Sequence, residues 1–213
     1  MRAFVTGGRG GIGRAIAAAL GDVDVDVVAL DLPDFDVGEV AAWRSLKGPF
    51  DAAFLNAGVV TGESDVVALT DEQYRRAFRA NVDGVVFGVR ECAARLMPDG
   101  GAIVCTASLS ALVPTPFDPV YGLTKHAVVG FVRSTAPQLA ARRIRINAIC
   151  PGFTDTPMVV AELRGALDVP LIDPAFVAEA ALRALHDEDT GGAWVVQANR
   201  IERFRFPGVP GPR

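Results

Sequence analysis

The sequence predicts an α/β protein in which a doubly wound parallel sheet forms a single domain. Three observations favour this fold class. Segments with the apolar pattern of strands alternate with segments of helical period along the 213 residues. The strand-like segments are short apolar runs, as expected of strands buried on both faces, and polar residues follow their carboxyl ends. A glycine-rich turn separates the first run from the first helical segment.

The expected elements follow the chain in order. Strands are predicted at Arg2–Thr6, Val25–Leu30, Ala52–Leu55, Ala102–Cys105, Ile144–Ile149 and Trp194–Gln197. Helices are predicted at about residues 12–20, 74–96, 121–141 and 174–186, with a short helix after Pro157. Residues 1–198 are therefore expected to form the domain. Residues 199–213 contain four Arg and three Pro without a period, which predicts an irregular C-terminal tail, either solvated or folded over a cleft.

Composition excludes several classes of function. The formal net charge is −4 and Lys and Arg form no dense stripe, which argues against nucleic acid as a partner. No apolar run reaches the roughly 18 to 20 residues needed to span a membrane, and no secretory leader is visible, so we expect a cytoplasmic protein. Three widely spaced Cys and two His predict neither a disulfide framework nor a metal site.

The glycine-rich turn points to a dinucleotide. Thr6-Gly7-Gly8-Arg9-Gly10-Gly11-Ile12-Gly13 follows a strand and opens a helix, whose first N–H groups can bind a pyrophosphate. In this Rossmann-type arrangement Gly7 allows the tight turn, Gly11 lets the backbone approach the phosphates, and Gly13 lets the helix pack closely on the sheet. The candidate cofactor residues of the turn are Gly7, Arg9, Gly11, Ile12 and Gly13.

Asp31 bears on the choice between NAD and NADP. It lies 18 residues after Gly13, at the end of the second predicted strand. A carboxylate there would accept hydrogen bonds from the adenosine ribose and repel a 2′-phosphate, which favours NAD. Two alternatives stay open: Asp31 could be an ordinary turn carboxylate, and the Arg9 guanidinium could contact a 2′-phosphate.

Three side chains could carry acid–base chemistry. Tyr121 and Lys125 are four residues apart on a predicted helix, so they lie one turn apart on the same face. An ammonium beside a phenol, with an oxidised nicotinamide, can lower the pKa of the phenol toward the range of a useful base. Ser108 follows a buried strand and could donate to a substrate oxygen. Taken singly, the Tyr–Lys pair could be a surface pair and Ser108 an ordinary turn residue.

The order of these motifs along the chain resembles the short-chain dehydrogenase/reductase family, over about residues 2–196. The shared motifs are the glycine turn, Asn56-Ala57-Gly58, Asn81-Val82-Asp83-Gly84, Ser108, Tyr121 with Lys125, and Pro151-Gly152. The resemblance implies that Tyr121 is the general acid/base, that Lys125 lowers its pKa and binds the nicotinamide ribose, and that Ser108 polarises the substrate oxygen. Asn81 would hold a water in a proton relay to Lys125.

The resemblance also implies further cofactor contacts. They are Asp36 and Val37 beside the adenine, Asn56, Ala57 and Gly58 after the third strand, and Pro151, Gly152, Thr154 and Thr156 after the fifth. This sequence departs from the family pattern in two places that bear on the site. Cys105-Thr106-Ala107-Ser108 lacks the usual Asn and first Ser but keeps the catalytic Ser. The segment from Asp31 to Asp51 is short, so its usual helix is expected to be lost or reduced.

Together these features predict an NAD-dependent oxidoreductase that interconverts an alcohol, expected to be secondary, and a ketone or aldehyde. The main alternative is a catalytically degenerate NAD(P)-binding scaffold on the same fold, and a lyase or epimerase using bound NAD is a third possibility. The helices at 74–96 and 121–141 resemble those with which the family forms homodimers and homotetramers. Six apolar residues could line a substrate cleft or the core: Leu109, Leu112, Val113, Phe117, Val120 and Phe153.

Overall fold

Seven strands form one sheet in the order β2-β1-β3-β4-β5-β6-β7. The structure is a computed structural model and describes residues 1–159 and 170–208. The strands are β1 (Arg2–Thr6), β2 (Asp26–Leu30), β3 (Ala52–Leu55), β4 (Gly101–Thr106), β5 (Ile144–Pro151), β6 (Ala193–Gln197) and β7 (Arg200–Arg203). β1 to β6 are parallel and β7 runs antiparallel to β6. The expected doubly wound parallel sheet is therefore confirmed, with one antiparallel strand added at an edge.

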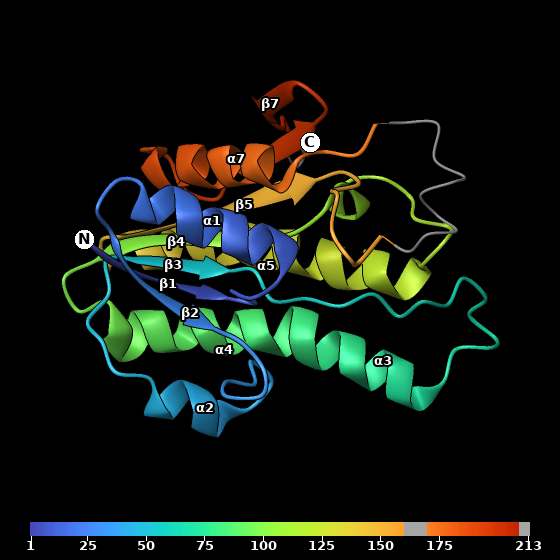
Figure 1. Cartoon of the computed structure of the whole chain (residues 1–213), viewed down its shortest axis with the longest axis horizontal. Coiled ribbons are helices and arrows are strands. Elements are labelled where there is room, and N and C mark those ends of the chain that lie inside the picture. Colours follow the sequence, from blue (N-terminus) through green and yellow to red (C-terminus); the bar gives the residue numbers. More distant parts are fainter. Residues whose placement is uncertain (160–169, 209–213) are drawn as a thin grey trace, which may run out of the picture.

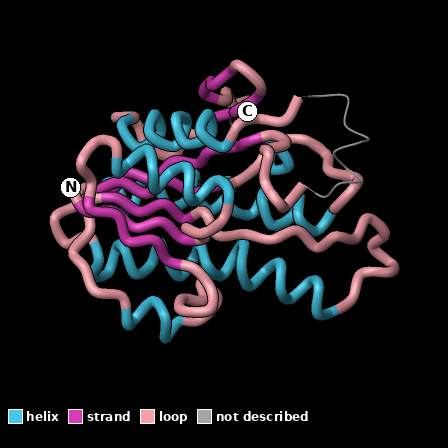
Figure 2. The backbone as a smooth tube through the Cα atoms, viewed as in Figure 1, coloured by secondary structure: helices cyan, strands magenta, loops and turns pink. Residues whose placement is uncertain are grey.

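Helices cover both faces of this sheet (Figure 1). The described helices are α1 (Gly11–Gly21), α2 (Val40–Ser45), α3 (Asp71–Phe78), α4 (Gly84–Glu91), α5 (Pro119–Ala140) and α7 (Pro174–His186). α1 and α7 lie on one face, and α2, α4 and α5 on the other. Figure 2 shows the strands, in magenta, between these two layers. The helix expected at 74–96 is one helical run, in which π-type turns η1 (Arg79–Asp83) and η2 (Cys92–Leu96) follow α3 and α4.

The inner strands β1, β3, β4 and β5 are buried along most of their length because helices cover both faces of the sheet. On β1, Phe4 packs in the cluster beneath α2, α4 and α5, whereas Ala3 and Val5 pack in the cluster beneath α1 and α7. β4 repeats this alternation, with Ile103 on the first face and Val104 on the second. The two clusters fix the register of the sheet, because a shift by one residue would exchange the faces.

The C-terminal prediction was wrong over four residues. Arg200–Arg203 form β7 and pair with β6, so the sheet extends beyond residue 198. A turn with Asn199 at φ 61° lets the chain reverse, because Asn tolerates the left-handed region better than most residues. The first residues of the predicted tail therefore pair with the backbone of β6, which would otherwise be the edge of the sheet. The short helix expected after Pro157 falls mainly on residues outside those described.

Three observations concern membrane spans, metal sites and disulfides. Within residues 1–159 and 170–208, no helix is long and apolar enough to cross a membrane. Over the same residues no cluster of His, Cys, Asp and Glu could hold a metal ion. Cys92, Cys105 and Cys150 are free thiols in the core.

The carboxyl ends of the parallel strands meet at one edge of the sheet. β1 lies between β2 and β3, so the chain leaves β1 toward one side and later returns to its other side. In open α/β sheets this reversal opens a crevice where ligands bind. Here the loops after β1, β3, β4 and β5 converge at that edge (Figure 1).

Trp43 on the short helix α2 holds one wall of this crevice. Its ring is fully buried and packs edge-on against Phe4 and Phe35, with ring centroids 6.0 and 5.0 Å apart. Its Nε1 donates to the carbonyl of Val37 at 2.8 Å. The helix after β2 is reduced to six residues, as expected. Its Trp43 side chain anchors the loop that precedes it.

We predict that Trp43→Ala lowers the free energy of unfolding by about 3 to 5 kcal/mol, because it leaves a large cavity between the sheet and α2. Urea unfolding followed by circular dichroism measures this change. Val67→Ala is the matched control, since Val67 is 89% exposed and its truncation should change stability by less than about 0.5 kcal/mol. Equal effects of the two substitutions would contradict the anchoring role.

Candidate active site

A cavity of about 950 Å³ lies along the carboxyl edge of the sheet. Its walls come from the glycine turn, the end of β2, the loops after β3, β4 and β5, and the first turns of α5. It is long enough to bring together residues predicted as cofactor contacts and residues predicted as catalytic. All of the residues predicted as catalytic or as cofactor contacts line it except Gly13 and Asn81.

The glycine turn after β1 fits an anionic group. Gly7 has φ 63°, a conformation that side chains rarely adopt. A Cβ at Gly13 would lie 2.0 Å from the carbonyl oxygen of Gly7, and one at Gly11 would lie 2.5 Å from Thr156 Cγ2. No side chain caps the N-terminus of α1, and Gly11 and Ile12 at that end line the cavity. The N–H groups of Gly8, Arg9 and Gly10 are bonded within the protein. The donors suited to a pyrophosphate are therefore those at the start of α1.

The charged side chains at the end of β2 already have hydrogen-bond partners within the protein. The Asp31 carboxylate accepts hydrogen bonds from the backbone N–H groups of Arg9 and Leu32, both at 2.8 Å. The Arg9 guanidinium turns instead to Asp34 at 2.6 Å and to the carbonyl of Leu32 at 3.0 Å. Asp31 thus lines the cavity as a carboxylate, and the positive charge of Arg9 is directed to a neighbouring acid.

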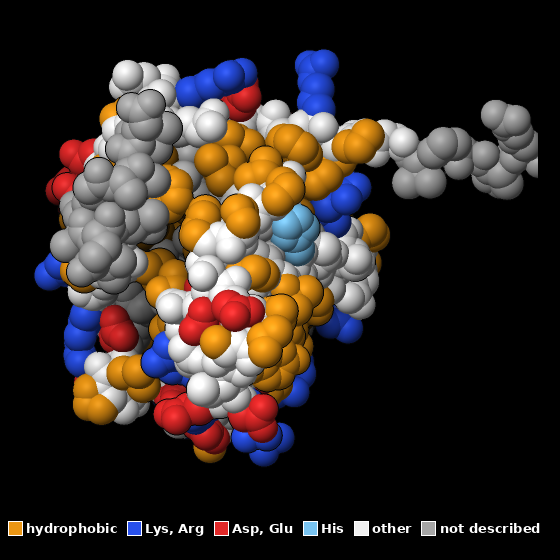
Figure 3. Space-filling model, turned by 90° about the vertical axis from the view of Figure 1, so that its right-hand side faces the viewer, with side chains coloured by type: hydrophobic (Ala, Val, Ile, Leu, Met, Phe, Trp, Pro, Cys, Tyr) orange, Lys and Arg blue, Asp and Glu red, His pale blue; other side chains and the backbone are white. Residues whose placement is uncertain are grey.

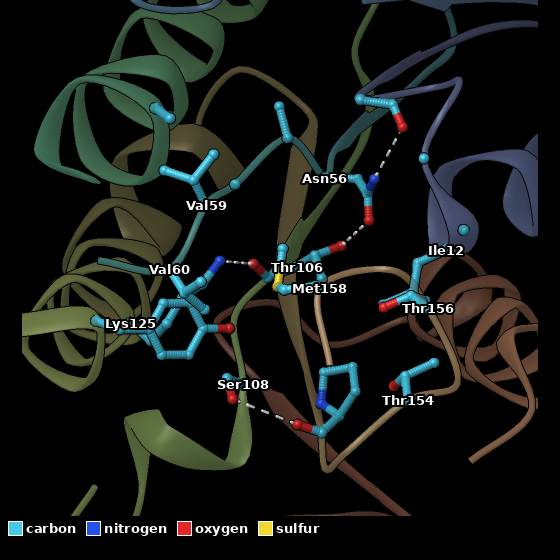
Figure 4. Close-up of a pocket in the computed structure, with 18 of the residues that line it drawn as sticks. Ile12, Asn56, Val59, Val60, Thr106, Ser108, Lys125, Thr154, Thr156 and Met158 are labelled. Atoms are coloured by element: carbon cyan, nitrogen blue, oxygen red, sulfur yellow. Dashed lines mark hydrogen bonds between the residues drawn. The ribbon is translucent and has the colours of Figure 1, made fainter. Parts of the chain in front are cut away.

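Asn56 joins three strands at the bottom of the cavity. Its Nδ2 donates to the carbonyl of Thr6 at 3.1 Å, and its Oδ1 accepts from Thr106 Oγ1 at 3.1 Å. Its backbone N–H donates to Thr6 Oγ1 at 2.9 Å. Figure 4 shows Asn56 between the glycine turn and Thr106. The side chain therefore fixes the ends of β1, β3 and β4 relative to one another.

Lys125 is buried, and its ammonium points at the end of β4 (Figure 4). Its Nζ donates to the carbonyl of Thr106 at 2.9 Å. Burial lowers its pKa from the usual 10.5 to about 8, and the nearby thiols of Cys150 and Cys105 raise it slightly.

Tyr121 and Ser108 lie in the same part of the cavity. The Lys125 Nζ is 5.5 Å from the centre of the Tyr121 ring. Burial raises the pKa of Tyr121 to about 12, hydrogen bonding with the Ser108 side chain lowers it, and the charges of Asp118 and Cys150 raise it. Ser108 Oγ also accepts from the N–H of Ser110 at 3.1 Å. The protein alone therefore keeps Tyr121 protonated at neutral pH, and a bound positive charge nearby would lower its pKa further.

Asn81 lies in the π-type turn η1, a kind of turn that often re-aims a side chain at functional sites. Its Oδ1 accepts from the N–H of Val59, and its Nδ2 donates to the carbonyl of Val59, both at 2.8 Å. Nδ2 also donates to Thr124 Oγ1 at 2.9 Å. A Cβ at Gly58 would lie 3.0 Å from Asn81 Oδ1 and 3.2 Å from Lys125 Nζ. Gly58 therefore leaves the space between these two polar groups open.

The remaining predicted cofactor residues are also brought to the cavity. Asp36 accepts from the N–H of Gly38 at 2.9 Å and forms an ion pair with Arg79 at 2.9 Å, beside Val37. Thr154 Oγ1 donates to the carbonyl of Gly152 at 3.2 Å. Ile12, Ala57, Pro151, Gly152 and Thr156 complete this part of the lining.

The apolar residues left open between cleft and core divide between the two. Leu109, Val113, Phe117 and Phe153 line the cavity, whereas Leu112 packs against the core. Val120 is half-buried and lies outside the lining. The rings of Phe117 and Phe153 lie 5.6 Å apart. Figure 3 shows apolar side chains gathered in several groups on the face that includes the mouth of the cavity.

Four polar residues of the site escaped sequence reasoning. The carbonyl of Thr106 accepts a hydrogen bond from Lys125, and the carboxylate of Asp34 accepts one from Arg9. The hydroxyl of Thr61 donates to the carboxylate of Asp118. Only Asp118 carried a readable signal. It directly precedes Pro119, and an Asp before a Pro is a typical helix N-cap with Pro at the first helical position. The helix was predicted to begin at Tyr121, two residues after its actual start at Pro119, so its cap was not predicted.

Comparisons with known proteins identify the family of this chain. A family model described as Enoyl-(Acyl carrier protein) reductase matches residues 37–196. A 3beta-hydroxysteroid dehydrogenase of Mediterraneibacter gnavus is 31% identical over 183 residues, which cover 73% of this chain and 66% of that protein. 3beta-hydroxysteroid dehydrogenase 2 of Eggerthella lenta is 31% identical over 185 residues, which cover 72% of this chain and 71% of that protein. The chain belongs to the short-chain dehydrogenase/reductase family.

Solved structures of short-chain dehydrogenases/reductases share the fold. One from Mycobacterium marinum has a TM-score of 0.86 at 24% identity, over 93% of this chain and 94% of that chain. A 3-oxoacyl-(acyl-carrier protein) reductase with bound NAD from Brucella melitensis has a TM-score of 0.79 at 28% identity, over 92% of this chain and 88% of that chain. The match to the first of the curated relatives spans slightly less than two thirds of that relative's length.

We predict that Lys125→Met stabilises the protein without cofactor by up to about 2 kcal/mol below pH 8. Lowering a pKa from 10.5 to about 8 costs about 3 kcal/mol, and the lost hydrogen bond to Thr106 offsets about 1 kcal/mol of the gain. The folded protein releases the proton between pH 8 and 10.5 while the unfolded chain retains it, so the unmodified protein gains stability through that window.

Thermal unfolding of both proteins at several pH values measures this difference. The advantage of Lys125→Met should shrink steadily between pH 8 and 10.5. An advantage that does not depend on pH would show that Lys125 is not a strained buried ammonium.

Proposed function

We propose that the protein is an NAD-dependent oxidoreductase that interconverts an apolar secondary alcohol and the corresponding ketone. The observation that carries this proposal is the convergence of Ser108, Tyr121 and Lys125 on one cavity that also contains the glycine turn and Asp31. Relatives named as hydroxysteroid dehydrogenases and a reductase structure with bound NAD support this class of reaction.

Tyr121 would exchange a proton with the substrate oxygen. Because its pKa is about 12 in the protein alone, it holds a proton at neutral pH and can donate it as a ketone is reduced. Ser108, whose side chain lowers the pKa of Tyr121, would donate to the same oxygen as charge develops there. NAD, when bound, supplies the hydride acceptor for oxidation and, as NADH, the hydride donor for reduction.

Lys125 would support Tyr121 in the opposite direction. Alcohol oxidation needs a phenolate, and a buried ammonium 5.5 Å from the ring centre favours that form. With a pKa of about 8, Lys125 is mostly charged at neutral pH. Its bond to the carbonyl of Thr106 leaves two further N–H donors, which suits contact with a ribose.

The arrangement of charges supports NAD over NADP. The Asp31 carboxylate faces the cavity, and it would repel the 2′-phosphate of NADP. Arg9 could compensate only by leaving Asp34, with which it forms an exposed ion pair. Asp36 with Val37 and Phe35 line the neighbouring part of the cavity, where the adenine would lie.

Apolar side chains support an apolar substrate. Val113, Phe117 and Met158 line the cavity although they are 50%, 45% and 43% exposed. Leaving apolar groups of this size in water is unfavourable, so a substrate that covers them would gain binding energy.

The cytoplasmic location and homo-oligomeric assembly expected from the sequence stay predictions.

We predict that Tyr121→Phe lowers kcat about 10²- to 10⁴-fold and leaves NADH affinity within a few-fold, because only the exchangeable proton is removed. Turnover is measured with a panel of apolar secondary alcohols and ketones, and NADH binding by fluorescence. Tyr74→Phe is the matched control, since Tyr74 is 42% exposed on α3 and should keep full activity. Full activity of Tyr121→Phe would exclude the proposed acid–base role.

We predict that Asp31→Ser strengthens NADPH binding about tenfold, equivalent to about 1.4 kcal/mol, because a negative charge beside the 2′-phosphate is removed. Asp34→Ala should have a smaller effect, about two- to fivefold, because it only frees Arg9 from an exposed pair. Titrations of both variants with NADH and NADPH measure these affinities. A parent protein that binds NADPH more tightly than NADH would refute the assignment of Asp31.

A further inference from the structure

Asp118 is a buried carboxylate at the start of α5. It is 4% exposed and forms no ion pair within the described parts of the chain. Its oxygens accept four hydrogen bonds instead. Oδ1 accepts from the N–H of Tyr121 at 2.9 Å and from Thr61 Oγ1 at 2.7 Å. Oδ2 accepts from the N–H groups of Thr61 at 2.8 Å and Gly62 at 3.1 Å.

These four bonds connect two walls of the cavity. The loop after β3 supplies three of the donors, and the backbone of Tyr121 supplies the fourth. The same loop is also held by Asn81, which bonds both backbone groups of Val59. Val59, Val60 and Gly62 all line the cavity. The part of the loop that lines the cavity is thus fixed at Val59 by Asn81 and at Thr61 and Gly62 by Asp118.

A helix cap alone does not require this arrangement. Ser, Asn or Asp would each satisfy the N–H of Tyr121 at the N-cap. Only a carboxylate presents two oxygens that both act purely as acceptors, which the three donors of the loop require. We propose that Asp118 is a positioning residue that locks the loop after β3 onto the helix carrying Tyr121 and fixes a negative charge at the start of that helix, three residues before Tyr121.

The Asp118 charge favours the neutral form of the Tyr121 phenol. Asp118 raises the pKa of Tyr121, as burial does, whereas Ser108 lowers it. The other titratable groups that face Tyr121 are Cys150 on β5 and Lys125 on α5 itself. Removing the carboxylate should therefore lower the pKa of Tyr121, so that the phenol loses its proton at a lower pH.

The test uses the fact that the chain contains two Tyr residues, Tyr74 and Tyr121. In a Tyr74→Phe background, the ultraviolet absorbance of the phenolate reports Tyr121 alone, without any substrate. Asp118→Asn keeps the helix cap but removes the charge and turns an N–H₂ group toward the loop donors. Thr61→Val is the matched control, because it removes one of the four bonds and keeps the charge.

We expect the absorbance of Asp118→Asn to titrate at a lower pH than that of the parent, and Thr61→Val to titrate like the parent. In kinetics, which rest on the proposed function, kcat/KM of Asp118→Asn should fall at least about tenfold through misplacement of the site. Its pH profile should shift to lower pH, and Thr61→Val should lose activity without that shift.

An Asp118→Asn protein with the titration and pH profile of the parent would overturn the proposal and leave Asp118 as a helix cap only. Absence of turnover in every variant and in the parent would instead refute the proposed function, while the absorbance titration still decides the role of Asp118. If Asp118→Asn does not fold, Asp118→Ser, which also caps the helix, takes its place in the same two measurements.

Discussion

The hydrogen bond from Lys125 to the carbonyl of Thr106 holds an ammonium in the interior, and much of the site is arranged around it. An isolated buried charge is costly, so its position is determined by the few groups that can partly satisfy it. Thr106 can do this because parallel pairing of β3, β4 and β5 brings the end of β4 to the middle of the carboxyl edge. The Thr106 side chain, bonded to Asn56, fixes that end to its neighbour.

Tyr121 lies between opposing electrostatic influences. Burial and the Asp118 charge raise the pKa of Tyr121 and so favour the neutral phenol, whereas the Ser108 side chain lowers that pKa. A balance of this kind lets a bound positive charge, such as an oxidised nicotinamide, change the protonation of the tyrosine by a modest further contribution. The same balance explains why the side chain is protonated in the protein alone, which suits the reduction of a ketone.

At the end of the cavity proposed for the cofactor, ion pairs hold the short segment that follows β2. Asp31, Asp34 and Asp36 follow β2 within six residues, and two of them engage Arg9 and Arg79. The loop is only as well placed as its anchor allows, because α2 has six residues and a single fully buried side chain, Trp43. The stability of this part of the fold and the shape of the end of the cavity proposed for the adenine are therefore coupled through one aromatic side chain, Trp43.

The sequence by itself determined the sheet, most element boundaries, the glycine turn and the Tyr121–Lys125 pair, because these depend on local period, turn chemistry and one helical repeat. It missed β7, since a four-residue edge strand with three charged residues carries no apolar pattern and forms only when β6 offers its free edge. Tertiary structure alone decided that Arg9 turns to Asp34, that Phe117 faces the cavity and Leu112 the core, and that Asp118 reaches Thr61 across 57 positions. Each of these depends on a contact between distant segments, and no local pattern encodes which of several polar partners a folded chain brings within hydrogen-bonding distance.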